Sequence, residues 1–232
     1  MKTPKALMSP LLLIALSVSS MIAQSSFEGM VESNNTTTDE MGALQRFTMT
    51  IWVREGRVRI SMSSFGSNPG TTILYHRDRG LTLMLDDRER TYFEIRQPRK
   101  SPGDQRLEAP RQSEIKRTGK ARKILGYPCD QLIARDGDAE TEYWATKGLS
   151  SLAEAIASAL GGDGNEVGSG VKDELAAMGY FPLIARTKLE GSVVESSEVT
   201  KIQKRRFEDS LFELPAGYRK QSVQDMIQEP GK

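Results

Sequence analysis

Apolar and polar residues alternate through residues 47–62, FTMTIWVREGRVRISM, and this alternation predicts two half-buried β-strands. Glu55-Gly56 separates them as a two-residue turn, because glycine readily takes the positive φ that such turns need. If Arg54 faces Arg57, both strands place their apolar side chains on one face of the hairpin. The pattern therefore predicts a β-hairpin with a defined register.

Shorter segments of the same kind follow, separated by turn residues and charged loops. Strands are expected at residues 71–76, 81–85, 91–95, 114–125, 129–135, 139–146, 183–189 and 193–203. Such a chain is mainly β (α+β), and we expect about ten or eleven strands. They would form a strongly curved antiparallel sheet, or incomplete β-barrel, that helices cover as a lid or fill as a plug.

Residues 150–179 interrupt the strands with a helical pattern. Ser151 and Glu154 have the spacing of a capping box, and Gly161 is placed to end the first helix. Its apolar stripe comprises Leu152, Ile156, Ala159 and Leu160, and that of a second helix at 171–178 comprises Val171, Leu175 and Met178. The glycine-rich link 162–170 between them would let this insertion move as a lid.

The first 25 residues are typical of a cleavable secretory signal. Lys2 and Lys5 precede an apolar run that ends at Ile22 and is too short for a membrane span. We expect cleavage near residues 24–26, a single domain over 26–220 and a polar tail at 221–232. No cysteine stands directly after the expected cut, so the mature protein should be soluble, without a lipid anchor, and periplasmic or secreted.

A basic segment runs from Arg96 to Lys123 and contains ten Lys or Arg residues but only three acidic ones. Its part at 96–112 is rich in proline and charge and is expected to be a flexible loop. We interpret this excess of cations as a solvated loop that keeps the protein soluble, and attraction to an anionic membrane surface is the alternative. A second basic run at 201–206 is interpreted as an exposed sheet edge guarded by Lys and Arg, with no nucleic-acid partner expected.

Residues suited to catalysis or metal binding are scarce. Cys129 is the single cysteine and His76 the single histidine, so a zinc site or a cysteine–histidine nucleophile has few candidates. We expect Cys129 to be a buried core residue and His76 an exposed turn residue. No phosphate-cradling loop or nucleophile-elbow motif is present, and the chain is expected to be non-enzymatic, without cofactor or metal.

Three motifs carry a resemblance to a known family: ILGYPCDQL, TEYWATKGL, and LFELPAGY ending at Tyr218. With them, residues 27–220 resemble an exported bacterial domain-of-unknown-function family, DUF4412-like, of the lipoprotein-carrier superfamily of LolA, LolB and RseB-like domains. The resemblance implies an incomplete antiparallel barrel with helices over its open side and an apolar cavity, which in relatives holds acyl chains.

Two functions remain open. The first is an envelope carrier or binding protein that holds a lipid or lipoprotein acyl chain in the half-barrel, and the second is an envelope protein-interaction or sensor module with a packed core. The oligomeric state stays undefined. The apolar residues expected to face the interior and bind the ligand are Phe47, Met49, Ile51, Val53, Val58, Ile60, Met62, Leu81, Leu83, Leu85 and Phe93.

Overall fold

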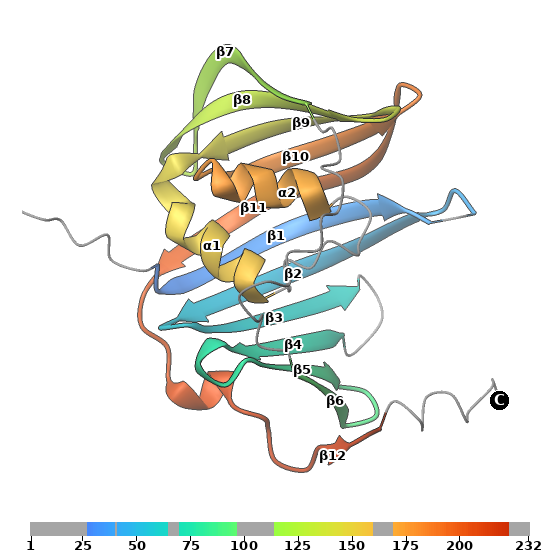
Figure 1. Ribbon diagram of the computed structural model, residues 1–232. Helices are drawn as coiled ribbons and strands as arrows, with labels where there is room; N and C mark the ends of the chain where they lie inside the picture. Colours follow the sequence, from blue (N-terminus) through green and yellow to red (C-terminus); the bar gives the residue numbers. More distant parts are fainter. Residues whose placement is uncertain (1–26, 40, 65–69, 97–113, 160–168, 223–232) are drawn as a thin grey trace, which may run out of the picture.

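A computed structural model describes residues 27–39, 41–64, 70–96, 114–159 and 169–222. These residues form one sheet of twelve strands in the order β12-β6-β5-β4-β3-β2-β1-β11-β10-β9-β8-β7 (Figure 1). All neighbouring strands are antiparallel except β12, which runs parallel to β6. Four expected features lie outside the described residues: the signal segment, the Gly161 cap, the tail beyond Ser222 and the loop at 96–112. Of that loop only Arg96, the last residue of β6, is described.

The elements have the following bounds. The strands are β1 (Gly29–Thr38), β2 (Leu44–Arg54), β3 (Arg57–Ser64), β4 (Thr71–His76), β5 (Leu81–Asp86), β6 (Thr91–Arg96), β7 (Glu114–Ile124), β8 (Tyr127–Asp136), β9 (Ala139–Thr146), β10 (Phe181–Leu189), β11 (Ser192–Lys204) and β12 (Arg219–Lys220). The helices are α1 (Ser150–Ala159) and α2 (Ser169–Ala177), with 3-10 turns η1 (Arg77–Arg79), η2 (Lys147–Leu149) and η3 (Asp209–Phe212).

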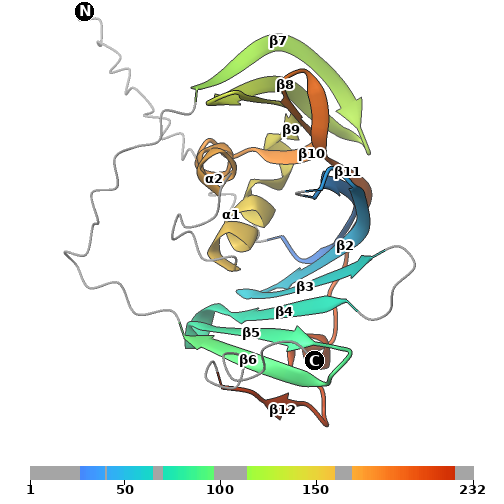
Figure 2. The same ribbon diagram turned by 90° about the vertical axis from the view of Figure 1, so that its right-hand side faces the viewer.

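The sheet curls around the two helices as an incomplete barrel, which confirms the predicted fold class (Figure 2). We call the side that faces α1 and α2 the concave face and the other side the convex face. Residues 207–221, the C-terminal strap, run from the end of β11 to β6 along the convex face. Both faces of β3–β6 are therefore partly covered, one by α1 and one by the strap.

The hairpin of β2 and β3 confirms the predicted register. Arg54 pairs with Arg57, and the apolar pairs Ile51–Ile60 and Met49–Met62 follow along the strands. Glu55 and Gly56 both have positive φ, 41° and 77°, as a two-residue turn between twisted strands requires. Local turn chemistry and strict alternation together fix this element.

The expected count of ten or eleven strands is too low, because β1 and the two-residue β12 lack an apolar pattern. β1 reads GMVESNNTTT, yet it lies between β2 and β11 and joins the two halves of the sheet. Ser33 and Asn35 are buried there, and Asn35 Nδ2 donates to the Ser33 carbonyl oxygen at 3.2 Å and to Ser33 Oγ at 3.1 Å. Polar side chains that are hydrogen-bonded to each other thus fill buried positions at the centre of the sheet.

The first helix begins differently from the prediction. Thr146 caps the preceding turn η2, since its side chain accepts a hydrogen bond from the Gly148 N–H at 3.1 Å. Ser151 lies inside α1, and its hydroxyl accepts from the N–H of Phe27 at 3.1 Å. The capping-box prediction is therefore wrong: the turn η2 starts the helix one residue earlier and leaves Ser151 to anchor the chain before β1.

Two further expectations need correction. β11 pairs with β1 along most of its length and with β10 only up to Glu198, so β11 is an interior strand but its basic run at 201–204 pairs on one side only; the outermost strands of the sheet are β7 and β12. Met178 follows α2 and is exposed, whereas Val171 and Leu175 are buried as predicted. None of the helices in the described part of the chain is long and apolar enough to cross a membrane.

Candidate functional site

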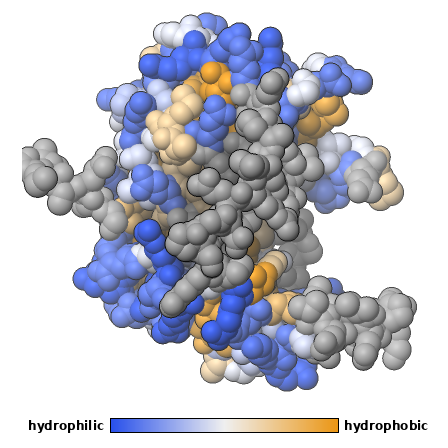
Figure 3. Space-filling view, viewed as in Figure 1, coloured by the Kyte–Doolittle hydropathy of each residue, from blue (hydrophilic) through white to orange (hydrophobic). Residues whose placement is uncertain are grey.

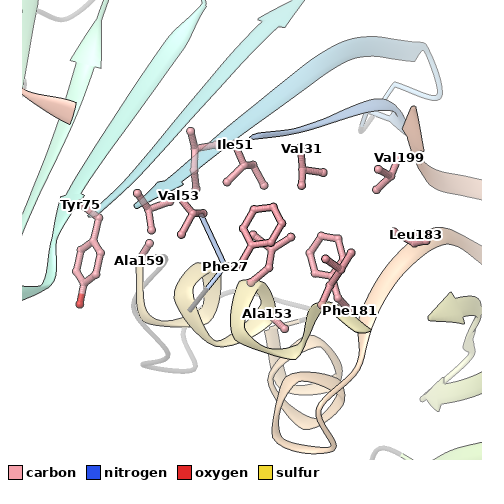
Figure 4. Close-up of a cluster of buried hydrophobic side chains, with 14 of the residues drawn as sticks. Phe27, Val31, Ile51, Val53, Tyr75, Ala153, Ala159, Phe181, Leu183 and Val199 are labelled. Carbon is pink, nitrogen blue, oxygen red and sulfur yellow. The ribbon is translucent and has the colours of Figure 1, made fainter. Parts of the chain in front are cut away.

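The middle of the concave face is a packed core beneath α1. Ile51, Val53, Val58 and Ile60 are only 2–4% exposed and belong to one cluster with Leu152 and Ala153 of α1, Phe27 and Phe181 (Figure 4). Four of the residues predicted to bind a ligand therefore lie in the protein's own core. With α1 packed on the sheet, these four side chains expose almost no surface to a second molecule.

Beside this core, the concave face continues as a row of half-buried apolar side chains. Direct cross-strand pairs lead from Ile60 to Ile73, then to Met84 and Phe93. Ile60 is 2% exposed, Ile73 is half-buried, Met84 is 37% exposed and Phe93 is again half-buried. The concave face is thus closed under α1 and more open over β4–β6.

A neighbouring row completes this surface. Met49 pairs with Met62, both half-buried, and Phe47 lies two residues before Met49 on the same face of β2. Hydrophobic side chains also reach the molecular surface over β3–β6 in the space-filling view (Figure 3). We define the apolar strip as the half-buried or exposed apolar residues of this concave region: Phe47, Met49, Met62, Ile73, Met84, Phe93 and Ile95.

The three leucines of β5 do not face this strip. Leu83 pairs with Leu74 while the next residue, Met84, pairs with Ile73, so Leu81, Leu83 and Leu85 lie on the convex face. There they form a second cluster with Leu74, Tyr92, Leu214 and Tyr218. The prediction that they share the inner face is wrong, because the C-terminal strap supplies an apolar cover on the outer side.

The strap is anchored at its start by arginines of β2 and β3. Arg54 Nη1 donates to the Phe207 carbonyl oxygen at 2.6 Å and forms an ion pair with Asp209 Oδ1 at 2.6 Å. Arg59 Nη1 donates to the Leu211 carbonyl oxygen at 3.1 Å. Charge-assisted hydrogen bonds of this kind are stronger than neutral ones and fix where the strap begins.

His76 holds the centre of the strap, contrary to the expected exposed turn position. It is 1% exposed, and its Nε2 donates to the Phe212 carbonyl oxygen at 2.9 Å. Phe212 itself is fully buried. The histidine is buried because the strap, more than 130 residues later in the chain, lies across the end of β4.

A family model matches most of the described chain. The model for the Domain of unknown function (DUF4412) matches residues 27–218. The chain belongs to this family. The match begins at Phe27, which packs under α1, and ends at Tyr218 of the strap, so it spans β1 to β11 and nearly all of the strap.

Two of the three motifs named in the sequence of this DUF4412 chain, ILGYPCDQL and TEYWATKGL, meet at one end of β8. Tyr127 packs against the main core next to buried Cys129, and a Cβ on Gly148 would lie 3.1 Å from the Tyr127 ring. A glycine at 148 therefore permits close approach of the turn η2 to β8. The strap motif acts elsewhere, where Tyr218 donates to Asp87 Oδ1 at 2.6 Å and covers the β5 leucines.

Solved structures with similar folds share little sequence with this chain. An uncharacterized conserved protein from Thermus thermophilus matches with a TM-score of 0.49 and 10% identity, covering 83% of this chain and 90% of that one. A putative outer membrane lipoprotein-sorting protein domain from Vibrio parahaemolyticus matches with a TM-score of 0.35 and 8% identity, covering 82% and 90%.

PNGF-II matches with a TM-score of 0.43 and 12% identity over 87% of this chain, which spans only 32% of the PNGF-II chain. Comparison with curated protein sequences finds no significant match. These likenesses assign no activity or ligand to the DUF4412 chain, whose function has to be argued from its own residues.

Cys129 and His76 lie in separate parts of the molecule. Cys129 is buried in the main core, as predicted, and its Sγ donates to the Tyr127 carbonyl oxygen at 3.5 Å. Burial raises the pKa of the Cys129 thiol above its ordinary value. His76 is committed to the strap on the convex face. A buried, protonated thiol without the histidine beside it is poorly suited to nucleophilic chemistry.

Titratable groups elsewhere take part in structural networks. Tyr180 donates to Asp130 Oδ2 at 2.6 Å, and Arg117 Nη2 donates to the same oxygen at 2.9 Å. The hydrogen bond from Tyr180 holds the pKa of the Asp130 carboxyl below its ordinary value, and Arg117 adds to this. Among the described residues, no group of three or more His, Cys, Asp or Glu side chains is placed to hold a metal ion.

An open hollow lies away from the apolar strip, between β7 and β8. Its cations are already engaged: Lys116 pairs with Glu114, Arg117 with Asp130, and Arg135 with Glu140. The hollow is lined by Glu114, Lys116, Arg117, Thr118, Ile133 and Arg135. Its lining differs from the apolar site that the sequence predicts, and the apolar strip remains the better candidate for a ligand.

Proposed function

We propose that this chain is an exported envelope carrier or binding protein, and that its apolar strip holds a lipid or another apolar ligand without covalent chemistry. The observation that carries the proposal is the contrast in solvent exposure between apolar side chains of the concave face under α1 and those beside it. The same row of cross-strand pairs is packed under α1 at Ile60 and open at Met84. A contiguous apolar surface of this kind marks a binding site more often than a simple exterior.

The composition of the strip suits a chain-like apolar ligand. Three of its seven members, Met49, Met62 and Met84, are methionines, whose unbranched side chains adapt to ligands of different shape. Each buried ligand methylene contributes about 0.8 kcal/mol. Ten of them would contribute about 8 kcal/mol before the cost of association, which places a fatty acyl chain in the range of weak to micromolar binding.

A second candidate follows from the packed centre of the face. Because Ile51, Val53, Val58 and Ile60 are buried under α1, the half-barrel also fits an envelope protein-interaction module that carries no small ligand. The two candidates differ in what accompanies the purified protein. A carrier should retain lipid, whereas an interaction module should be lipid-free and should be recovered with a protein partner after crosslinking in cells.

The test combines native mass spectrometry of the purified protein with titration of a fluorescent fatty acid. We expect bound lipid in the spectrum and saturable binding of the fatty acid by the wild type. Met84→Glu should weaken that binding, because it places a charge on the open end of the strip. Leu44→Glu, at an exposed apolar residue outside the strip (60% exposed), is the matched control and should bind normally.

Wild-type protein that is lipid-free and shows no saturable binding would overturn the proposal. Equal affinity of the wild type and Met84→Glu would also overturn the choice of site. Melting temperatures of both variants establish that each one is folded.

A further inference from the structure

The turn between β7 and β8 places an apolar residue where hairpins normally carry a polar one. Leu125 has φ 47° and Gly126 has φ 85°, so both residues of the turn adopt the left-handed conformation. Leu125 is also 46% exposed. A leucine is disfavoured in this backbone region and gains nothing from exposure to water, so two unfavourable features coincide at one residue.

Other turns of the same sheet show what this position ordinarily holds. Among the described residues, the other non-glycine residues with positive φ are Glu55, Arg90 and Glu190, all charged. Glu55-Gly56 and Glu190-Gly191 are two-residue turns of the same kind as Leu125-Gly126. The fold therefore accepts a charged residue at this position, and its requirements do not explain the leucine.

Basic residues are frequent in the strands that flank the leucine. Residues 115–129 contain five Lys or Arg residues and no Asp or Glu, and two of the five, Lys116 and Arg117, pair with Glu114 and Asp130 at the ends of this segment. Arg122 and Lys123 directly precede the turn and are exposed, and the Arg122 guanidinium lies 4.1 Å from the centre of the Trp144 ring. From the end of β11, Lys204 places its ammonium 5.5 Å from the centre of the Tyr127 ring. Arg122, Lys123 and Lys204 thus place positive charge near the base of the apolar turn.

The tip projects into open space. A Cβ added at Gly126 would meet no atom within 4 Å. β7 is also an edge strand of the sheet, so it has no further strand beside it. The turn can consequently approach a flat surface without obstruction from the described residues.

We propose that the Leu125-Gly126 turn docks this protein on an anionic lipid bilayer. Leu125 enters the interface between headgroups and acyl chains, while Arg122, Lys123 and Lys204 contact lipid phosphates. A single apolar wedge with cations around it matches a bilayer surface, whose apolar layer lies beneath a layer of negative charge. An acidic protein surface would satisfy the cations but would leave the exposed leucine without a partner.

The proposal goes beyond ligand binding by the apolar strip and is independent of it. The turn belongs to β7 and β8, whereas the strip belongs to β2–β6 on the other side of β1 in the sheet. A carrier has to meet a membrane to exchange a lipid, and this turn supplies the contact. A change in the turn should leave fatty-acid binding by the purified protein unaltered.

Vesicle co-sedimentation of the full mature chain tests the docking. We expect binding to vesicles of phosphatidylcholine and phosphatidylglycerol, weaker binding at high salt, and little binding to phosphatidylcholine alone. Leu125→Asn removes the wedge but retains a residue that tolerates positive φ, so it should fold normally and bind roughly tenfold to a hundredfold less. Lys123→Ala should lower binding about fivefold.

Met41→Glu is the matched control, because Met41 is an apolar residue, 90% exposed, in the β1–β2 turn at the opposite end of the sheet. It should bind vesicles as the wild type does. The proposal is overturned if the wild type ignores anionic vesicles, if Leu125→Asn binds them normally, or if Met41→Glu loses binding as strongly. Retention of the wild type by an acidic protein but not by vesicles would identify a protein partner instead and would equally overturn it.

Discussion

Leu83 and Met84 are sequence neighbours on opposite faces of β5, and alanine at each should have opposite consequences. Leu83 is 7% exposed and packs with Leu74 and Leu85 beneath the C-terminal strap. Removing a buried leucine side chain typically costs about 2–5 kcal/mol, from lost burial and the cavity that remains. Met84 is 37% exposed on the concave face, so its replacement should cost at most about 1 kcal/mol.

Urea unfolding followed by tryptophan fluorescence measures this difference. With an m-value of about 2 kcal/mol/M, Leu83→Ala should lower the unfolding midpoint by roughly 1–2.5 M, and Met84→Ala by less than about 0.5 M. Total stability of a domain is about 5–15 kcal/mol, so Leu83→Ala should remain folded in water. Fatty-acid titration should then show the reverse order, with weakened binding for Met84→Ala and normal binding for Leu83→Ala.

The stability half of this prediction depends only on the packing of β5. If Met84→Ala proves the more destabilising variant, the assignment of the two faces is refuted whatever the protein binds. If the stability order is as expected but both variants bind fatty acid equally well, the fold account stands and the apolar strip is not the site.

Three other changes test separate parts of the structure. Phe212→Ala should cost about 3–5 kcal/mol and make the C-terminal strap sensitive to trypsin, because Phe212 is fully buried; unchanged stability and proteolysis would contradict the docking of the strap. Asp130 has a lowered pKa in the folded state, so its contribution to stability is present at neutral pH and is lost as the pH falls below about 4. The stability deficit of Asp130→Asn measured by urea unfolding should accordingly shrink between pH 7 and pH 3, and an equal deficit at both pH values would argue against it. Cys129 should react with a thiol reagent only slowly at neutral pH until urea is added, because burial raises the pKa of its thiol; complete labelling of the native protein within seconds would show that it is accessible.

Local patterns predicted local structure well. The β2–β3 hairpin has the register that the sequence implies, because its turn and its alternation are read from adjacent residues. The helical insertion was also found within residues 150–179. Even there, the start of α1 was missed, because the cap lies on Thr146 in a preceding turn that has no helical periodicity.

Features that depend on distant segments escaped prediction. Alternation shows that Leu81, Leu83 and Leu85 share a face, but which face becomes buried depends on the strap more than 120 residues later. The burial of His76 has the same cause. β1 escaped because its buried Ser33 and Asn35 satisfy each other by hydrogen bonds, which apolar periodicity does not detect.

The candidate site was predicted in part for the same reason. Phe47, Met49, Met62 and Phe93 lie on the apolar strip, as the alternation of their strands implied. Met84 was missed, since it has the opposite parity from the leucines around it. The position of α1 decides which inner residues become core and which stay open, and a sequence pattern does not specify where a helix settles on a sheet.

Photo-crosslinking with a diazirine-bearing fatty acid tests the central claim most directly, because it reports the bound position as well as binding. Peptide mapping after irradiation should place saturable adducts on the concave strands, at or beside Met49, Met62 and Met84, and excess unlabelled fatty acid should suppress them. Adducts confined to exposed apolar turns such as Met41, or labelling that excess fatty acid does not suppress, would contradict the account.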